Sequence, residues 1–389
     1  MNDSSVARRP PPPVPVSIVT GFLGAGKTTL LNRLLRDPAL AKAVVLINEF
    51  GEIGLDHLFV EKIDGDMVMM ASGCLCCTIR GDLIDSLEDL LRRRDNGRMR
   101  DFDRVIIETT GLADPAPVLH TIMSQPYLLL RFRLDGVVTV VDAINGAATL
   151  DAYPEALKQA AVADRLALAK TDLVVTDEQR RSLARLRARL VELNPTARIV
   201  EDFSDCATAA VLDAGLYDPA TKSPDVARWL NAEALIDRQG SHDHAHAAHS
   251  SASATETDAA NRHSESIRTF CFVSDEPMAP SAFNLFLEML RGAHGPSLLR
   301  VKGVVALSDD VSRPLVIHGV QHVFHPPVRL DAWPDQDRRT RIVFIIRHLN
   351  PNFIEQLYSA FAGKVRIDQP DALALTENPL KPAPGGLLS

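Results

Sequence analysis

Short apolar runs alternate with amphipathic stretches over the first 230 residues of the chain. Near-continuous apolar strands are typical of parallel sheets that helices cover on both faces. A helix is predicted over 82–93, because its leucine and isoleucine positions recur on one helical face. The pattern therefore predicts an α/β fold with a mostly parallel, doubly wound sheet. The predicted strands are 16–20, 43–48, 67–71, 104–108, 136–141, 165–169 and 197–200.

The pattern changes beyond residue 230. Residues 231–266 contain almost no large apolar side chain, which predicts a flexible, histidine-rich linker that cannot form a core by itself. Apolar strands and amphipathic helices return over 267–365, as a smaller C-terminal α+β domain of roughly β-α-β-β-β-α order. Proline-rich tails are predicted at 1–13 and 366–389, which leaves 14–230 as the first folded domain.

The composition limits the classes of partner. The 389 residues are 46% hydrophobic and 24% charged, as in ordinary globular proteins, and they suffice for two domains. A net charge of -8 disfavours nucleic acid as the main partner, because phosphate backbones usually need a basic face. No apolar run is long enough to span a bilayer, and a proline run stands where a signal peptide has its apolar core. We therefore expect a cytoplasmic protein without a membrane partner.

The sequence GFLGAGKT (21–28) predicts a phosphate-binding loop. Gly21, Gly26, Lys27 and Thr28 have the spacing G-x-x-x-x-G-K-T between a predicted strand and a helix. Glycines let backbone N–H groups surround phosphate oxygens, and the helix N-terminus adds its dipole. Lys27 would meet the β- and γ-phosphates, and Thr28 would ligate Mg²⁺. A glycine-rich turn without a ligand is the alternative, which the complete spacing disfavours.

Two further groups complete the predicted catalytic set with Lys27. Glu108 ends the strand 104–108, where a carboxylate can hold Mg²⁺ directly or through water. The amide of Gly111 can meet a γ-phosphate. The alternative for Glu108 is a solvent-facing carboxylate at a strand end.

The base-binding group is predicted directly after the strand 165–169. Asp172 can accept two hydrogen bonds from guanine that adenine cannot supply, and the stem of Lys170 can cover the base. Ala169 stands where the usual guanine signature has asparagine. The sequence favours GTP over ATP, with a helix-capping role of Asp172 as the alternative.

Three crowded cysteines predict a second chemistry. Cys74, Cys76 and Cys77 lie between a strand end and a helix, where thiolates are stabilised. Sulfur ligands suit Zn²⁺, Co²⁺ or Cu⁺, and three of them leave an open position suited to transfer. The alternatives are a strained disulfide between Cys76 and Cys77, or structural thiols.

Two polar segments can add metal ligands. The acidic segment 49–56 lies where a P-loop GTPase would place a nucleotide-sensing switch, and Glu52 is its preferred metal-ligand candidate over Glu49 and Asp56. A solvated acidic loop is the alternative. In the linker, a weak metal-collecting tract is predicted, with a plain polar linker as its alternative; its histidines are His242, His244, His246 and His249.

Six motifs in this order resemble the CobW-type P-loop GTPases. They are GFLGAGKTTLLN, NEFGEIGLD, GCLCC, ETTGLADPAPV, ADRLALAKTDL and LLRVKGVVAL, and the resemblance covers about 15–225 and 267–365. That family is similar in turn to the nickel-insertion GTPases of hydrogenase and urease maturation. By position, the resemblance adds Gly24, Ala25 and Thr29 to the phosphate and Mg²⁺ site. It makes Cys74, Cys76 and Cys77 the site of a transferable metal.

The resemblance implies a GTP-hydrolysing metallochaperone for Zn²⁺ or Co²⁺, and the lack of an obvious strong general base in the sequence predicts slow turnover. Its client would be a metalloprotein or a cobalamin-pathway enzyme, engaged by the C-terminal domain, and a nucleotide- or metal-dependent homodimer is compatible with it. GTP and Mg²⁺ would order the 49–56 segment and so change metal affinity, with the reciprocal effect on nucleotide affinity. Two other functions stay open: a P-loop small-molecule kinase, and a non-enzymatic metal buffer with a nucleotide switch.

Overall fold

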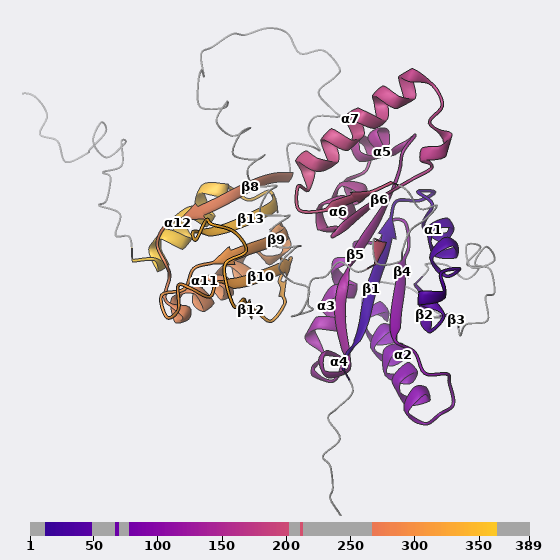
Figure 1. Cartoon of the computed structure of the whole chain (residues 1–389), viewed down its shortest axis with the longest axis horizontal. Coiled ribbons are helices and arrows are strands. Elements are labelled where there is room, and N and C mark those ends of the chain that lie inside the picture. Colours follow the sequence, from indigo (N-terminus) through magenta and orange to yellow (C-terminus); the bar gives the residue numbers. More distant parts are fainter. Residues whose placement is uncertain (1–11, 49–66, 70–77, 202–210, 213–266, 364–389) are drawn as a thin grey trace, which may run out of the picture.

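The computed structural model describes residues 12–48, 67–69, 78–201, 211–212 and 267–363. These residues form a nucleotide-binding domain around a parallel sheet and a C-terminal domain around an antiparallel sheet (Figure 1). The predicted boundaries of the linker and tails fall largely outside the described residues, so the division of the chain at 230 and 365 stays a prediction.

The described sheet of the first domain has seven strands, all in parallel pairs. Their order is β3-β2-β4-β1-β5-β6-β7, which places β1 at the centre with β4 and β5 beside it. Each strand coincides with a predicted apolar run, so the predicted fold class is confirmed. The strands are β1 (Val14–Gly21), β2 (Ala43–Asn48), β3 (Met67–Met69), β4 (Arg104–Thr109), β5 (Phe132–Asp142), β6 (Arg165–Ala169) and β7 (Arg198–Val200).

Helices cover both faces of this sheet. Consecutive residues of β4 show the division, because Ile107 packs into the core cluster that contains α2 and α3 residues and Ile106 into the one that contains α1 residues. Burial on both faces explains why the strands are continuously apolar. The helix predicted at 82–93 is longer than expected. The helices are α1 (Lys27–Leu34), α2 (Thr78–Asp95), α3 (Ala116–Ser124), α4 (Pro126–Arg131), α5 (Gly146–Ala152), α6 (Pro154–Val162) and α7 (Asp177–Leu193), with short 3-10 turns η1 (Pro38–Leu40) and η3 (Thr171–Leu173).

The C-terminal domain has the predicted order of major elements. Its antiparallel sheet runs β11-β10-β9-β13-β8, with β12 paired to β10. The chain turns between β10 and β11, where Gln321 adopts a left-handed backbone (φ 53°). The elements are β8 (Ile267–Ser274), α11 (Pro280–His294), η4 (Gly295–Ser297), β9 (Leu298–Val305), β10 (Leu315–Val320), β11 (Val323–Phe324), β12 (Val328–Arg329), β13 (Thr340–Arg347) and α12 (Pro351–Phe361).

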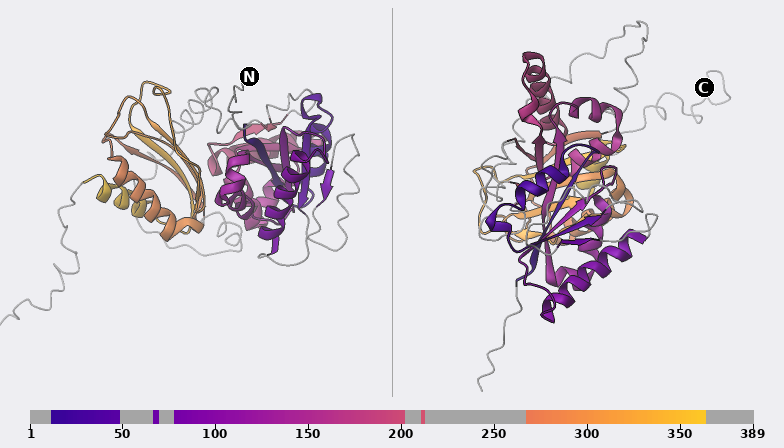
Figure 2. Two further views of the ribbon diagram at one scale, coloured as in Figure 1. Left: turned by 90° about the horizontal axis from the view of Figure 1, so that it is seen from below. Right: turned by 90° about the vertical axis from the view of Figure 1, so that its right-hand side faces the viewer.

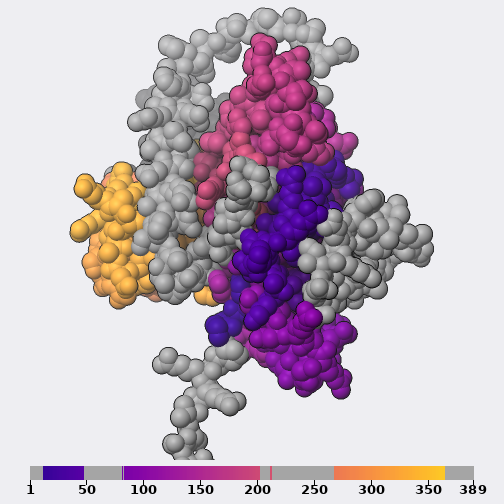
Figure 3. All heavy atoms as spheres, turned by 45° about the vertical axis from the view of Figure 1, so that its right-hand side comes forward, coloured from indigo at the N-terminus to yellow at the C-terminus, as the bar shows by residue number. Residues whose placement is uncertain are grey.

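The two domains share a packed seam. Helices α11 and α12 cover the outer face of the C-terminal sheet, and its other face turns toward the nucleotide-binding domain (Figure 2). Leu299, Val320 and Ile345 of the C-terminal sheet belong to the same core cluster as residues of α3 and α6. In the space-filling view the orange-to-yellow residues of the C-terminal domain lie to the left of the indigo-to-magenta residues of the nucleotide-binding domain (Figure 3). The domains are therefore docked through buried apolar contacts rather than joined only by chain.

Candidate functional site

The phosphate-binding loop leads from the central strand β1 into α1. Gly26 precedes the helix with φ 105°, a left-handed conformation that favours glycine. Lys27 is buried, and its ammonium donates hydrogen bonds to the carbonyl oxygens of Gly21 (2.9 Å) and Phe22 (3.4 Å). The charge is thus held inside the curve of the loop, and its contact with a phosphate stays a prediction.

Thr28 and Glu108 meet beside this loop although they are far apart in sequence. The Thr28 hydroxyl donates to Oε1 of Glu108 at 3.5 Å. Register explains the meeting, since Glu108 lies opposite Val19 in the parallel pair of β1 and β4. Glu108 is only 5% exposed, so it is not the solvent-facing carboxylate of the alternative. A hydroxyl and a carboxylate side by side are the hard oxygen ligands that suit Mg²⁺.

Gly111 follows β4 and touches the phosphate-binding loop. A Cβ built at Gly111 would lie 2.6 Å from the backbone nitrogen of Leu23 and 2.8 Å from its Cα. Those distances are far inside van der Waals contact, so glycine alone permits this approach. The segment after β4, residues 110–115, thus packs directly on the loop, and we call it the Gly111 loop.

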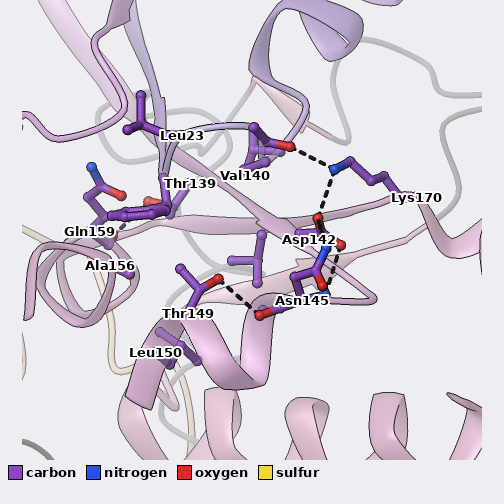
Figure 4. Close-up of a pocket in the computed structure, with 15 residues that line it drawn as sticks. Leu23, Thr139, Val140, Asp142, Asn145, Thr149, Leu150, Ala156, Gln159 and Lys170 are labelled. Carbon is purple, nitrogen blue, oxygen red and sulfur yellow. Dashed lines mark hydrogen bonds and ion pairs between the residues drawn. The ribbon is translucent and has the colours of Figure 1, made fainter. Parts of the chain in front are cut away.

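The predicted base-binding residues lie on the other side of the phosphate-binding loop. The Lys170 ammonium donates to the Gly24 carbonyl and to Oδ2 of Asp142, each at 2.7 Å (Figure 4). Burial opposes ionisation of Asp142, but hydrogen bonds from Lys170, Asn145 and Ile144 hold the pKa of its carboxyl below the usual range. These hydrogen bonds therefore hold the Lys170 ammonium against the phosphate-binding loop.

Three other predicted loop or base residues are also placed. Asp172 lies exposed in η3, and Thr29 is exposed in the first turn of α1. Ala25 is buried. Sequence reasoning missed Asp142, although its position at the carboxyl end of an apolar strand is the same signal that identified Glu108.

A small hollow of about 220 Å³ lies between the phosphate-binding loop and helices α5 and α6 (Figure 4). Its lining includes Phe22, Leu23, Val140, Leu150, Ala156 and Gln159. Gln159 lines this hollow, and its side-chain amide donates hydrogen bonds to the carbonyls of Gly111 (3.1 Å) and Ala113 (3.0 Å). Sequence reasoning missed Gln159, and nothing in the pattern of an ordinary amphipathic helix distinguishes it.

The predicted transferable-metal ligands lie outside the described residues. This holds for Cys74, Cys76, Cys77 and Glu52, and for the histidine tract at His242, His244, His246 and His249. Within the described ranges, no group of three or more His, Cys, Asp or Glu side chains could hold a metal ion. The predicted metal site therefore stays a prediction.

A buried ionic cluster crosses the seam between the domains. Asp164, just before β6, forms ion pairs with Arg300 and Lys302 of β9. The Lys302 ammonium lies 3.1 Å from Oδ1 of Asp164. Its other oxygen accepts from the Val137 amide at 3.0 Å, and Arg300 also donates to the carbonyl of Val162 in α6 at 3.2 Å. Asp164, Arg300 and Lys302 are each no more than 3% exposed. We call these three residues the Asp164 cluster.

Charge in this cluster is unbalanced, with two cations on one carboxylate. Burial would raise the pKa of Asp164, but Arg300 and Lys302 hold it far below the usual range. Burial lowers the pKa of Lys302 to about 8 despite the attraction of Asp164. Burial and the neighbouring cations also lower the pKa of His318, and burial with Arg300 lowers that of His325 to about 3. Asp164 is therefore the carboxylate that offsets the two cations of this cluster.

No helix in the described part of the chain is both long enough and apolar enough to cross a membrane.

The parallel sheet, the loop after β1 and the Thr28–Glu108 pair define a P-loop nucleotide-binding protein. Residues 15–201 match the model of the CobW/HypB/UreG nucleotide-binding domain, and residues 267–362 match that of the cobalamin synthesis protein cobW C-terminal domain. The chain belongs to this family, and it is a P-loop GTPase.

Relatives extend the match to both domains. The zinc chaperone YjiA of Escherichia coli is 31% identical over 90% of this chain and 98% of its own length. The zinc-regulated GTPase metalloprotein activator 1 of Schizosaccharomyces pombe is 38% identical over 49% of this chain and 46% of its own. The solved structure of Zn(II)-bound YjiA GTPase has a TM-score of 0.62 and 27% identity, covering 92% of this chain and all of that one.

Proposed function

We propose that this GTPase is a metallochaperone that binds Zn²⁺ and delivers it to a client protein under nucleotide control. The observation that carries the proposal is the match over both domains to a relative named a zinc chaperone. The geometry of the nucleotide site supports the same cycle, since the lysine, the hydroxyl and the carboxylate that the cycle needs are assembled.

In this proposal the described residues divide the work on the nucleotide. Lys27 and the backbone of residues 21–26 hold the phosphates, and Thr28 and Glu108 hold Mg²⁺. Bound Mg²⁺ would neutralise charge that develops on the phosphate oxygens. Gly111 presents its amide to the γ-phosphate, and Asp172 reads guanine beside Lys170. Positioning and charge, without a strong general base in the proposed set, would give slow turnover.

The proposed cargo site is Cys74, Cys76 and Cys77, with Glu52 as a further ligand. Thiolates bind Zn²⁺ well, and Co²⁺ is a second candidate for the same ligands. A YjiA variant in which one glutamate and two consecutive cysteines are replaced by alanine still holds Zn(II) in a solved structure, so those three side chains do not hold that zinc. The cysteine site proposed here therefore rests on the sequence motif of this chain. Closely spaced thiols would need the reducing cytoplasm to stay metal-competent.

Nucleotide state would control the cargo through the acidic segment 49–56. Its position between the phosphate-binding loop and the cysteines lets GTP and Mg²⁺ reshape the metal site, and linkage makes the effect reciprocal. The clients in this proposal are metalloproteins or cobalamin-pathway enzymes, met through the C-terminal domain. A homodimer formed with GTP or metal is the accompanying hypothesis, which size-exclusion chromatography in each state tests.

Anaerobic competition titrations with Zn²⁺ and Co²⁺ test the proposal. They are made with GDP–Mg²⁺ and with a non-hydrolysable GTP analogue, on a full-length chain whose four tract histidines are replaced by glutamine. We expect one tight site whose affinity changes with the nucleotide, and Cys76→Ser removes both the site and the change. A tight site indifferent to the nucleotide, or no tight site at all, contradicts the proposal.

A further inference from the structure

One buried side chain of α6 holds the Gly111 loop through two hydrogen bonds. Gln159 of α6 is 1% exposed, and its amide nitrogen donates to two carbonyls of that loop, those of Gly111 and Ala113. The backbone carbonyl of Gln159 separately accepts a hydrogen bond from the Thr139 hydroxyl of β5 at 2.7 Å. Gln159 thus joins the segment that touches the phosphate-binding loop to helix α6.

Helix α6 also contacts the C-terminal domain through its last residue, Val162. Gln159 and Val162 are three residues apart, so they lie on neighbouring turns of one face, about 4.5 Å apart along the helix axis. The Val162 carbonyl accepts from Arg300, and Asp164 just beyond the helix accepts from Arg300 and Lys302. A displacement of the Gly111 loop that moved α6 would therefore also shift β9 through these contacts.

A second contact joins the same loop to the C-terminal domain directly. Asp114 accepts a hydrogen bond from the Gln321 amide at 3.2 Å, and the Lys158 ammonium of α6 lies 3.7 Å from the same carboxylate oxygen. Gln321 is the left-handed residue of the turn between β10 and β11. Gly111 and Ala113 are thus hydrogen-bonded to α6, and Asp114 contacts both α6 and the turn between β10 and β11.

We propose that Gln159 is a positioning residue for GTP hydrolysis and that it makes the C-terminal domain sense the nucleotide. It holds the Gly111 amide toward the γ-phosphate, and it fixes the Gly111 loop to the helix on which the Asp164 cluster rests. The inference rests on the γ-phosphate role proposed for Gly111, and it supplies a route by which GTP state would reach a client-binding domain.

The test compares three full-length chains without added Zn²⁺. Gln159→Leu replaces the amide with an apolar side chain that is one atom shorter, and it removes both hydrogen bonds to the Gly111 loop. Thr139→Val is the matched control, because it removes one buried hydrogen bond to the same residue but none to the loop. GTP turnover and the affinities for GDP and for a non-hydrolysable GTP analogue are measured with Mg²⁺.

We expect Gln159→Leu to lower kcat about tenfold and to weaken binding of the GTP analogue about fivefold. GDP affinity should stay within about twofold, because GDP has no γ-phosphate to meet Gly111. Thr139→Val should keep both kcat and the preference for GTP over GDP. Unchanged kcat in Gln159→Leu, or equal losses in both variants, would overturn the positioning role.

Amide hydrogen exchange tests the second half. In the wild-type chain we expect the amides of residues 318–324 to exchange several-fold more slowly with the GTP analogue than with GDP. Gln159→Leu should abolish this difference, and Thr139→Val should keep it. A difference absent from the wild type, or persisting in Gln159→Leu, would overturn the link to the C-terminal domain. Because these assays contain no added Zn²⁺ and no client, their failure is distinct from a missing nucleotide effect on zinc affinity.

Discussion

Asp164 is the one carboxylate of the ionic cluster described at the seam, so replacing it with asparagine is the sharpest perturbation of domain docking. The substitution Asp164→Asn would keep the shape and an acceptor for the Val137 amide, but it would remove the charge that faces Arg300 and Lys302. Because all three residues are at most 3% exposed, water does not replace the lost charge while the domains stay docked.

The magnitude follows from burial. Removing one partner of a buried ion pair typically costs about 3–5 kcal/mol, because the remaining charge is left without compensation. Here two cations are left, and the pKa of Lys302, about 8 with Asp164 present, would fall further. Loss of its proton, or separation of the domains, limits the cost. We therefore expect a loss of about 3–5 kcal/mol in the stability of the docked C-terminal domain.

Trp333 provides the assay. It packs in the C-terminal domain against the cluster of Val304, Val316 and Leu330. With Trp229→Phe as background, its fluorescence in urea follows that domain, while GTP turnover and small-angle scattering follow the other domain and the docking. Asp164→Asn should lower the urea midpoint and expand the molecule. Adding Arg300→Met and Lys302→Met should restore much of the loss, since it removes the stranded charges.

Asp135→Asn is the matched control. Asp135 is 2% exposed and paired with Arg104, but this pair lies inside the nucleotide-binding domain. It should destabilise that domain with little effect on the Trp333 transition. A loss below about 1 kcal/mol for Asp164→Asn, or an equal shift of the Trp333 transition in both variants, would refute the reasoning.

Three further predictions concern the nucleotide site and pH. Gly111→Ala places a Cβ 2.6 Å from the Leu23 nitrogen, so GTP turnover should fall at least about tenfold with GDP binding retained, as phosphate release and equilibrium titration will show. Normal turnover would mean that the Gly111 loop moves away at no cost. Glu108→Gln removes a negative charge 3.5 Å from the Thr28 hydroxyl, so half-saturation in Mg²⁺ should rise about tenfold or more, with Asp172→Asn as a control that leaves it unchanged. Burial lowers the pKa of His318 and His325 well below 6.5, so both stay neutral in the folded state while the unfolded chain is protonated below that pH. Stability present above pH 6.5 should therefore fall between pH 7 and pH 5, by about 2 kcal/mol for His325, and His325→Gln should remove that share of the slope in urea titrations. An unchanged slope would show that His325 takes up a proton in the fold.

The fold and the nucleotide site were predictable because both depend on local patterns. Ile106 and Ile107 are buried on opposite faces of one sheet, which makes the strand apolar at every position. The phosphate-binding loop follows from a fixed spacing, and Glu108 follows from its place at the end of a neighbouring strand. Parallel register then brings distant residues together without any further signal.

The contacts across the seam could not be predicted because they join distant segments. Asp164 and Arg300 are 136 positions apart, and each alone resembles an ordinary surface charge. One signal was present in the sequence: Arg300 and Lys302 alternate in an otherwise apolar strand, which places both on one face. The turn at Gln321 was missed because no glycine, asparagine or proline marks it.

The seam also determines where the two ends of the connection between the domains lie. Ile199 at the end of the first domain and Ile267 at the start of the second pack against the same apolar cluster, and Thr269 donates to the Leu193 carbonyl at 2.9 Å. The chain therefore leaves and returns at one place on a surface that is already assembled. The distance between these two attachment points is therefore fixed by the packed fold, and entropy makes a connection of almost any length between them nearly equal in cost. On this ground we expect chains shortened within 240–265 to keep GTP binding and domain docking, as nucleotide titration and small-angle scattering will show.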